Sequence, residues 1–272
     1  MACLHWGRGD YLAAVRKDMR ALVVTPTFNE RDNLPKVVER VLALPEHIEL
    51  LVVDDNSPDG TGALADAFAA RHPRVHVQHR AEKDGLGRAY VAGFKWALAR
   101  DFDFVLEMDG DLSHNPDDVP RLIEAAKNAD LVLGSRYRDG LRVINWPLSR
   151  LVLSLGAALY VQMITGMPFS DPTGGFKCFR RGALAELDLD AVRSNGYSFQ
   201  IELTHQIWRR GRRVVEVPII FTDRFLGQSK MSRKIVREAL LMVWRLLLQN
   251  GLRRCPTRPG QGAAGHSTGI SS

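Results

Sequence analysis

Two carboxylates just after an apolar run are the part of this sequence best suited to chemistry. The apolar segment 102–106 predicts a buried strand, and Asp109 and Asp111 follow it, separated by Gly110. Carboxylates at positions i and i+2 of an extended chain point the same way, so both could bind one divalent cation together with water and ligand phosphates. Gly110 would let a ligand come close. The alternative is a solvated Asp-Gly turn.

A second pair of acids, Asp54 and Asp55, follows the strand predicted at 48–53. In an open parallel sheet the carboxyl ends of the strands lie along one edge, where nucleotides bind. No GxGxxG follows the first strand and no GxxxxGK[ST] occurs, so the common dinucleotide and P-loop sites are disfavoured. The phosphates would need a cation and basic side chains, although each basic side chain could equally be a solvated surface charge. The candidates outside helical charge runs are Arg136, Arg224 and Lys230.

Other motifs are less specific. The segment GLGRAY, residues 85–90, precedes a predicted helix and is more typical of close packing than of a phosphate-binding loop. His114 is the histidine nearest to the acids, but a single histidine without a second partner is more often structural than a ligand. No GxSxG and no plausible Cys-His pair occurs, which argues against acyl transfer through a nucleophile.

The elements that must position these residues alternate regularly in the first half of the chain. Short apolar strands separated by helices of about 10 to 15 residues predict parallel pairing with right-handed crossovers. The predicted fold class is therefore α/β, with a Rossmann-like, mostly parallel sheet flanked by helices. The predicted strands are 21–25, 48–53, 75–78, 102–106 and 130–133, and the helices are 34–42, 62–71, 85–100 and 117–127.

This regularity stops after residue 137. Two apolar segments follow, 151–164 and 235–249, and basic residues flank the second on both sides. Each could lie at a membrane interface as an amphipathic helix, or pack on the sheet or on the other. The remaining predicted elements are a Gly-rich turn within 169–180, a helix at 196–208 and a strand at 214–221.

The chain has ordinary globular composition, with 272 residues, of which 45% are apolar and 25% charged. Three cysteines without paired spacing argue against a disulfide framework or a zinc site and favour a reducing cytosol. No run of about 18 apolar residues occurs, so we expect no segment to span a bilayer. The net charge of +6 is uneven, because residues 206–258 hold thirteen Lys and Arg against three acids, a net of +10 that leaves −4 for the rest. This basic end predicts a polyanion, a phosphate ligand or an anionic membrane surface as partner.

Eight sequence blocks, taken together and in order, resemble the inverting family-two glycosyltransferases with the GT-A fold, and more narrowly the polyprenyl or dolichyl phosphate mannose synthases. The blocks are PTFNERDNL (26–34), VVDDNSPDGT (52–61), GLGRAY (85–90), MDGDLSHNP (108–116), GSRY (134–137), DPTGGFK (171–177), GYSFQIEL (196–203) and PIIFTDRFLGQSKM (218–231). The resemblance implies one GT-A domain at 21–250, with a nucleotide-binding half at about 21–137 and an acceptor, membrane-facing half at about 138–250. Residues 1–20 would be an N-terminal extension and 251–272 a disordered tail.

The resemblance also implies roles for individual residues. The guanosine part of GDP-mannose would be held by Pro26, Phe28, Glu30, Val53 and Asp55. Mg2+ or Mn2+ and the diphosphate would be bound by Asp109 and Asp111, with Gly110 beside the nucleotide and Ser113 as a third metal ligand. The diphosphate and the incoming lipid phosphate would be neutralised by Arg136, Arg224 and Lys230. Phe28 stands where the family often has Tyr, and Ser113 where some members have Gln. Asp171 is a candidate for orienting the sugar, with a simple turn residue as the alternative.

The implied reaction is a metal-dependent transfer of mannose, with inversion, from GDP-mannose to a polyprenyl (dolichyl-type) monophosphate, which gives polyprenyl phosphate mannose. The attacking phosphate oxygen is ionised at neutral pH, so it needs no strong base, and the catalytic task of Asp109 and Asp111 is to help GDP depart. The resemblance implies a cytoplasmic enzyme that lies peripherally on the cytoplasmic face of a membrane, with or without a membrane-protein partner, and that binds no nucleic acid.

Three alternatives remain open at this point. The enzyme could use UDP-glucose with the same kind of acceptor, because one sequence does not fix the base or the sugar. The segment LLVVDDN, residues 50–56, resembles the acidic pocket of a receiver-type signalling module, but that interpretation leaves Asp109, Asp111 and the C-terminal half without a role. The basic end could bind nucleic acid, although its arginines alternate with aliphatic side chains more than with stacking aromatic ones.

Overall fold

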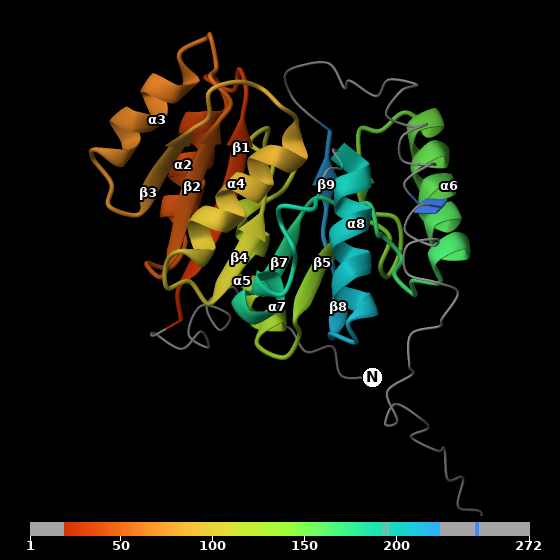
Figure 1. Ribbon diagram of the computed structural model, residues 1–272. Coiled ribbons are helices and arrows are strands. Elements are labelled where there is room, and N and C mark those ends of the chain that lie inside the picture. The colour runs from red at the N-terminus through yellow and green to blue at the C-terminus, as the bar shows by residue number, and fades with distance from the viewer. Residues whose placement is uncertain (1–18, 193, 195, 224–242, 245–272) are drawn as a thin grey trace, which may run out of the picture.

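A seven-stranded sheet forms the centre of the computed structural model, which describes residues 19–192, 194, 196–223, 243 and 244. The strand order is β3-β2-β1-β4-β7-β5-β8, and a separate small sheet pairs β6 with β9 (Figure 1). The strands are β1 (Ala21–Thr27), β2 (Ile48–Asp54), β3 (Val75–His79), β4 (Phe104–Glu107), β5 (Leu131–Ser135), β6 (Val143–Ile144), β7 (Lys177–Arg180), β8 (Val214–Pro218) and β9 (Phe221–Thr222).

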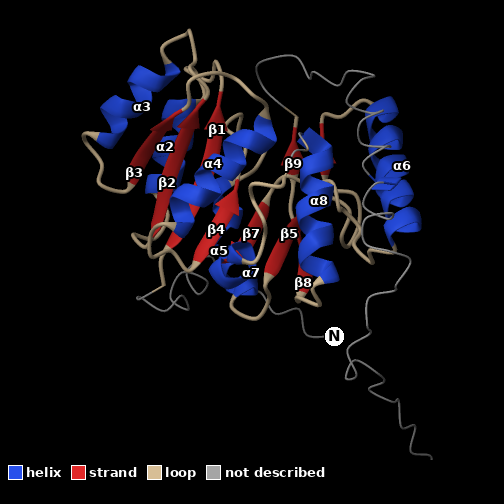
Figure 2. Cartoon of the chain, in the orientation of Figure 1, coloured by secondary structure: helices blue, strands red, loops and turns tan. Residues whose placement is uncertain are grey.

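Helices cover both faces of this sheet (Figure 2). They are α2 (Leu34–Leu42), α3 (Thr61–Ala69), α4 (Leu86–Leu98), α5 (Val119–Ala126), α6 (Leu148–Thr165), α7 (Arg181–Ala185) and α8 (Gly196–Arg209), with a 3-10 turn, Pro116–Asp118, before α5. Side chains alternate along β1, so Leu22 and Val24 pack with α4 and α8, whereas Ala21 and Val23 pack with α2 and α5 on the other face. The predicted α/β fold with a mostly parallel sheet is confirmed.

The GLGRAY segment begins α4 and serves close packing. A Cβ on Gly87 would lie 2.5 Å from the backbone oxygen of Ser194 and 3.0 Å from the Phe199 ring, so glycine is required for α4 to come this close to α8. Tyr90 stacks on the same ring, with 6.0 Å between centroids. The packing interpretation of this segment is therefore the one that the contacts support.

β7 runs antiparallel between β4 and β5, whereas the other neighbouring pairs of this sheet are parallel. Its register places Lys177 opposite Glu107 of β4 and Leu133 of β5. Because β7 runs the opposite way, the loop before it, residues 171–176, lies at the edge where β4 and β5 end. That edge therefore collects residues from both halves of the chain.

α6 stands at the side of the layered body, beyond α8 (Figure 1). It contains 18 residues, more than the predicted 151–164, and by length and composition it could cross a membrane. The expectation that no segment is long and apolar enough to span a bilayer is therefore wrong for α6 by length and composition. Length and composition do not distinguish a helix that crosses a membrane from one that lies on its surface.

Polar contacts along α6 tie it to the rest of the protein. Arg150 Nη1 donates to Asp223 Oδ1 at 2.7 Å, and the Tyr137 hydroxyl donates to Ser154 Oγ at 2.6 Å. Further along, Gln162 Nε2 donates to a backbone carbonyl at 2.8 Å. These contacts hold the helix alongside the domain.

Some of the residues singled out in the sequence lie outside the described residues. They are Arg224, Lys230, the extension 1–18, the tail 251–272 and, apart from Val243 and Trp244, the helix predicted at 235–249.

Candidate active site

The two carboxylates predicted to bind metal lie where β4 ends. The Tyr90 hydroxyl of α4 donates to Asp109 Oδ1 at 3.0 Å, and the backbone N–H of Ser113 donates to Asp111 Oδ1 at 2.9 Å. The side chain of Asp109 is 27% exposed, whereas Asp111 is buried. A hydroxyl of α4 therefore holds Asp109, a backbone N–H of the same loop holds Asp111, and Asp109 is the more accessible of the two.

A divalent cation fits this pair if its other ligands come with the substrate. Among the described residues, no three His, Cys, Asp or Glu side chains form a cluster that could hold a metal. Mg2+ at nucleotide sites is commonly bound by one or two carboxylates together with substrate phosphates and water, which matches Asp109 and Asp111. The hydroxyl of Ser113, next to them, is buried and has no hydrogen-bond partner in the described part of the chain. It is therefore suited to the ligand role predicted for it.

His114 supports the loop that carries the acids. Its Nδ1 accepts the backbone N–H of Asp109 at 3.1 Å, and its ring stacks on Phe176 with 4.9 Å between centroids. Burial lowers the pKa of His114, although the charge of Asp109 acts in the opposite direction. The neutral ring then carries its proton on Nε2. The structural role, favoured from the sequence, agrees with these contacts.

Two buried residues of opposite charge type, one on β4 and one on β7, lie next to the acids and were not predicted from the sequence. Glu107 of β4 and Lys177 of β7 face each other in register, and both are fully buried. Burial raises the pKa of Glu107 to about 7 against the attraction of Lys177, and burial lowers the pKa of Lys177 to about 8. Lys177 Nζ also donates to the backbone oxygen of Gln200 in α8 at 2.7 Å. Glu107 and Lys177 thus lie where β4, β7 and α8 meet. The sequence feature that could have revealed this site was a glutamate within an otherwise apolar strand.

The two acids of the second pair are both buried but have different partners. Asp54 is buried and accepts hydrogen bonds from Thr27 Oγ1 at 3.0 Å and Ser57 Oγ at 2.6 Å, so it ties the end of β1 to the turn after β2. Asp55 instead pairs with Arg80 Nη1 at 2.6 Å. Burial raises the pKa of Asp55, and the charge of Arg80 opposes that rise.

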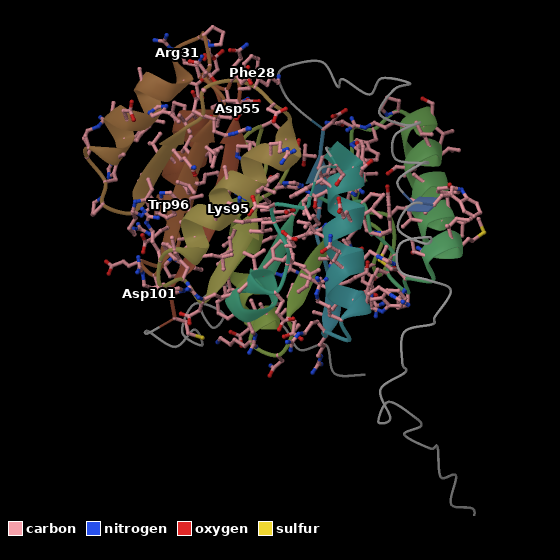
Figure 3. All side chains as sticks on the ribbon, viewed as in Figure 1. Phe28, Arg31, Asp55, Lys95, Trp96 and Asp101 are labelled. Carbon is pink, nitrogen blue, oxygen red and sulfur yellow. The ribbon has the colours of Figure 1, made fainter. Side chains whose placement is uncertain are left out.

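Phe28 lies at the same edge as Asp55, close to the ends of β1 and β2 (Figure 3). Lys83 Nζ lies 3.7 Å from the centroid of the Phe28 ring, a cation–π contact. Arg80 and Lys83 were not among the residues predicted from the sequence. A feature of the sequence could have revealed them: both are basic residues in the segment between the third predicted strand and GLGRAY, and this segment begins where that strand ends.

Other residues predicted to hold the nucleoside also meet at this edge. Pro26 of β1 pairs with Val53 of β2 in register, and Val53 is fully buried, so a contact from Val53 to a ligand would come from its backbone. A Cβ on Gly110 would lie 3.4 Å from the Pro26 backbone oxygen, so the acid loop packs tightly on β1. Glu30 Oε2 accepts from Asn33 Nδ2 at 2.7 Å, at the start of α2.

Arg136 and Asp171, predicted for separate roles, pair with each other. Arg136 Nε and Nη2 donate to the two carboxylate oxygens at 2.6 Å each, and the Arg136 backbone N–H donates at 3.0 Å. Burial acts to raise the pKa of Asp171, but these contacts with Arg136 hold it below its ordinary value. Both side chains are buried, so Asp171 already matches the charge of Arg136. The rings of Tyr137, Trp146 and Phe221 surround the guanidinium.

An exposed apolar stripe runs along α6, close to this aromatic group. Trp146, in contact with Phe221, also packs under Arg150 of α6, whose guanidinium carbon lies 4.2 Å from the Trp146 ring centroid. The stripe consists of Leu148, Val152, Leu159 and Met163, whose exposed fractions are 74%, 61%, 54% and 67%. Residues with this spacing lie on one face of a helix. An apolar surface of this kind is typical of contact with a membrane or another protein.

Comparison with known proteins agrees with this arrangement. Residues 22–188 match the family described as glycosyl transferase family 2. An undecaprenyl-phosphate mannosyltransferase of Micrococcus luteus is 50% identical over 228 residues, which cover 84% of this chain and 93% of that protein. A polyprenol monophosphomannose synthase of Mycolicibacterium smegmatis is 51% identical over 239 residues, 87% of this chain and 90% of that protein. A dolichol-phosphate mannosyltransferase of Pyrococcus furiosus is 35% identical over 86% of this chain and 65% of its own length.

The fold has matches among solved structures. Glucosyl-3-phosphoglycerate synthase of Mycobacterium tuberculosis, in complex with Mn2+, UDP and glucosyl-3-phosphoglycerate, aligns with a TM-score of 0.64. The alignment covers 90% of this chain and 86% of that chain at 20% identity. A likeness at this level of identity establishes the shared fold of the two proteins.

Proposed function

Because the chain belongs to glycosyl transferase family 2, we propose that it transfers mannose from GDP-mannose to the phosphate of a polyprenyl monophosphate lipid. The observation that carries the proposal is identity of about half, over nearly the full length, to two enzymes named for polyprenyl phosphate and mannose. Asp109 and Asp111 at the end of β4 give the site that such a reaction needs. The receiver-type and nucleic-acid alternatives leave this site without a role.

The ends of β1, β2 and β4 would bind the donor. Phe28 offers a ring on which a base can stack, Asp55 accepts N–H groups from the edge of that base, and Asp109 and Asp111 hold Mg2+ or Mn2+ beside the diphosphate. The bound cation would supply stabilisation of the negative charge that develops on departing GDP. Tyr90 and Ser113 keep the two carboxylates oriented for that task.

The acceptor phosphate would approach from the side of β5, β7 and α6. Its oxygen attacks the anomeric carbon opposite the leaving diphosphate, so the configuration inverts, and no protein base is required because the phosphate is already ionised. The Arg136 and Asp171 pair shapes this side of the site, and Asp171 orients the sugar through its neighbours. Arg224 and Lys230, outside the described residues, are proposed to neutralise the two phosphates.

A lipid acceptor also explains the apolar stripe on α6. We propose that the stripe lies in the interface of the cytoplasmic face of a membrane, while the polar contacts of α6 hold the domain against that surface. The enzyme is then peripheral, with the donor half at about 21–137 facing the cytosol and the acceptor half at about 138–250 facing the lipid. A membrane-protein partner could strengthen this attachment.

A transfer assay with the purified full-length chain tests the proposal. Vesicles that contain a polyprenyl phosphate are incubated with Mn2+ and labelled GDP-mannose or labelled UDP-glucose, and the label in the lipid fraction is counted. We expect label from GDP-mannose that depends on the polyprenyl phosphate. Label from UDP-glucose in preference to GDP-mannose would instead support the glucosyltransferase, and label from neither would contradict both.

A further inference from the structure

The loop after β3 makes contacts that the proposed function does not use. Arg80 directly follows β3, its backbone N–H donates to the Asp54 backbone oxygen at 2.8 Å, and its Nη1 donates to Asp55 Oδ1 at 2.6 Å. The side chains of Arg80 and Asp55 are only 16% and 6% exposed. Arg80 is therefore held through its backbone and its guanidinium together, and it limits how the Asp55 carboxylate can turn.

We propose that Arg80 is a specificity-determining residue, which fixes the Asp55 carboxylate so that it accepts two N–H groups from the edge of a guanine base. The inference rests on the proposed function, which assigns Asp55 to the guanosine part of the donor. Arg80 acts through Asp55, so it is a positioning residue for base recognition.

The chemistry of the bases makes this arrangement selective. Guanine presents N1–H and the exocyclic N2–H side by side, whereas uracil presents a single N–H between two carbonyl groups. A carboxylate has about four acceptor positions, so Asp55 can accept from Arg80 and still receive two parallel N–H groups. A carboxylate free to rotate would lose that geometry, and the preference for guanine would weaken.

The charge of Arg80 also keeps Asp55 an acceptor. Burial raises the pKa of Asp55, and Asp54 raises it further, while Arg80 and Lys83 lower it. Without Arg80, Asp55 would take up a proton at a higher pH than in the wild type. A protonated carboxyl accepts fewer hydrogen bonds, so guanine recognition would become sensitive to acid.

The same loop provides a matched control. Lys83, three residues later, lies over the Phe28 ring, with its Nζ 3.7 Å from the ring centroid, so it contacts the proposed stacking platform. Lys83→Met and Arg80→Met each remove one positive charge from this loop. A general loss of attraction for phosphates would affect both variants alike, whereas loss of base recognition is expected from Arg80→Met alone.

The experiment measures the affinity of the full-length chain for GDP, IDP and UDP by calorimetry with saturating Mn2+. IDP is GDP without the exocyclic amino group, so the ratio of the IDP and GDP dissociation constants reports the second N–H contact. We expect a wild-type ratio of about tenfold or more, because a site built for a hydrogen bond rejects the analogue that lacks it. Arg80→Met should reduce the ratio to about threefold or less, while Lys83→Met should leave it unchanged.

A pH series separates this role from a structural one. Between pH 7.5 and 5.5 the ratio should stay constant in the wild type and fall with decreasing pH in the Arg80→Met variant. Ionisation of the diphosphate cancels in the ratio because GDP and IDP share it. Arg80→Gln, which keeps a polar side chain, should behave like Arg80→Met and serves if the methionine variant fails to fold.

Each remaining outcome overturns the inference. An unchanged ratio in both Arg80 variants would mean that Arg80 does not set base specificity, while a wild-type preference for GDP would leave the proposed donor intact. An equal change of the ratio in the Lys83→Met variant would make the effect electrostatic and unspecific. Equal wild-type affinity for GDP, IDP and UDP would remove the guanosine assignment together with the inference.

Discussion

Two regions of the molecule are built in different ways: the proposed donor edge, where β1, β2 and β4 end, and the proposed acceptor side, formed by α6 and the small sheet of β6 and β9. At the donor edge, hydrogen bonds hold Asp54, Asp109 and Asp111, and β2 and β4 beneath them are buried at every residue. On the acceptor side, only 11% of the 18-residue helix α6 is buried, and its apolar stripe is exposed. A soluble nucleotide needs a site that is complete before it arrives, whereas a lipid acceptor brings its membrane as the missing surface.

The largest effect is expected from substitutions at the donor edge. We expect Asp109→Asn or Asp111→Asn to lower the rate of mannose transfer at least about thousandfold, because each variant removes a proposed charged ligand of the cation that would assist departure of GDP. Circular dichroism should show an unchanged fold, since these acids lie at a strand end. Asp84→Asn, an exposed acid that pairs only weakly with Arg88, is the matched control. Full turnover in both active-site variants would contradict the metal assignment.

The next prediction concerns Arg136 and Asp171, where the two regions meet. Asp171→Asn should reduce the free energy of unfolding by about 3 to 5 kcal/mol, because it leaves the Arg136 guanidinium buried without its partner. Denaturant titration at pH 7 measures the loss. Arg212→Gln, which breaks the exposed contact with Glu186, should leave the free energy of unfolding nearly unchanged, because solvent screens that contact. Similar costs for the two variants would mean that the buried pair carries little energy.

A third prediction is that substitutions on α6 weaken vesicle binding without weakening GDP binding. Val152→Glu with Leu159→Glu places charges on the apolar stripe and should lower binding to polyprenyl phosphate vesicles at least about tenfold, since each buried side chain contributes about 1.5 to 3 kcal/mol. Affinity for GDP should stay at the wild-type value. The control is Ala63→Glu with Ala67→Glu, two exposed positions of α3. A parallel loss of GDP affinity and vesicle binding in the stripe variant would show that α6 serves the fold as a whole.

The last prediction is a pH dependence of stability that arises in the C-terminal half of the chain. Burial lowers the pKa of His205 in α8 from 6.5 to about 4, and Arg209 adds to the shift. Between these values the unfolded chain binds more protons than the folded one, so stability is complete above pH 6.5 and is lost as pH falls toward 4, by up to about 3 kcal/mol. His205→Leu should flatten this slope in denaturant titrations at pH 7 and 5. Equal slopes in both proteins would refute the assignment.

The regular donor edge was largely predictable from the sequence. Strand ends carry the acids at Asp55 and Asp109, and the alternation of strands with helices placed those ends along one edge. The predicted bounds of several elements were close to the observed ones, as for the strand predicted at 48–53 and observed at Ile48–Asp54. Periodicity works here because a strand buried on both faces is apolar throughout, and its first polar residues mark its end.

Which charged side chains pair with each other was not predictable from one sequence. Arg136 looked like a free cation, but β7 brings Asp171 to the same edge, and that depends on strand order. Arg80 was passed over for the same reason, since its link to Asp55 follows from the pairing of β2 with β3. The length of α6 was underestimated because its first turn begins directly after Pro147, before the continuous apolar run.

The position of β7 has a consequence for how this protein is made. Both neighbours of β7 in the sheet, β4 and β5, are synthesised before β7. The position between them therefore stays empty until residue 180 has been synthesised. During that interval the edges of β4 and β5 that β7 later covers are unpaired, and such edges invite pairing with other chains. A fragment that stops at residue 137 would keep this gap permanently. Nascent chains stalled before β7 should therefore depend on chaperones more than those stalled just after it.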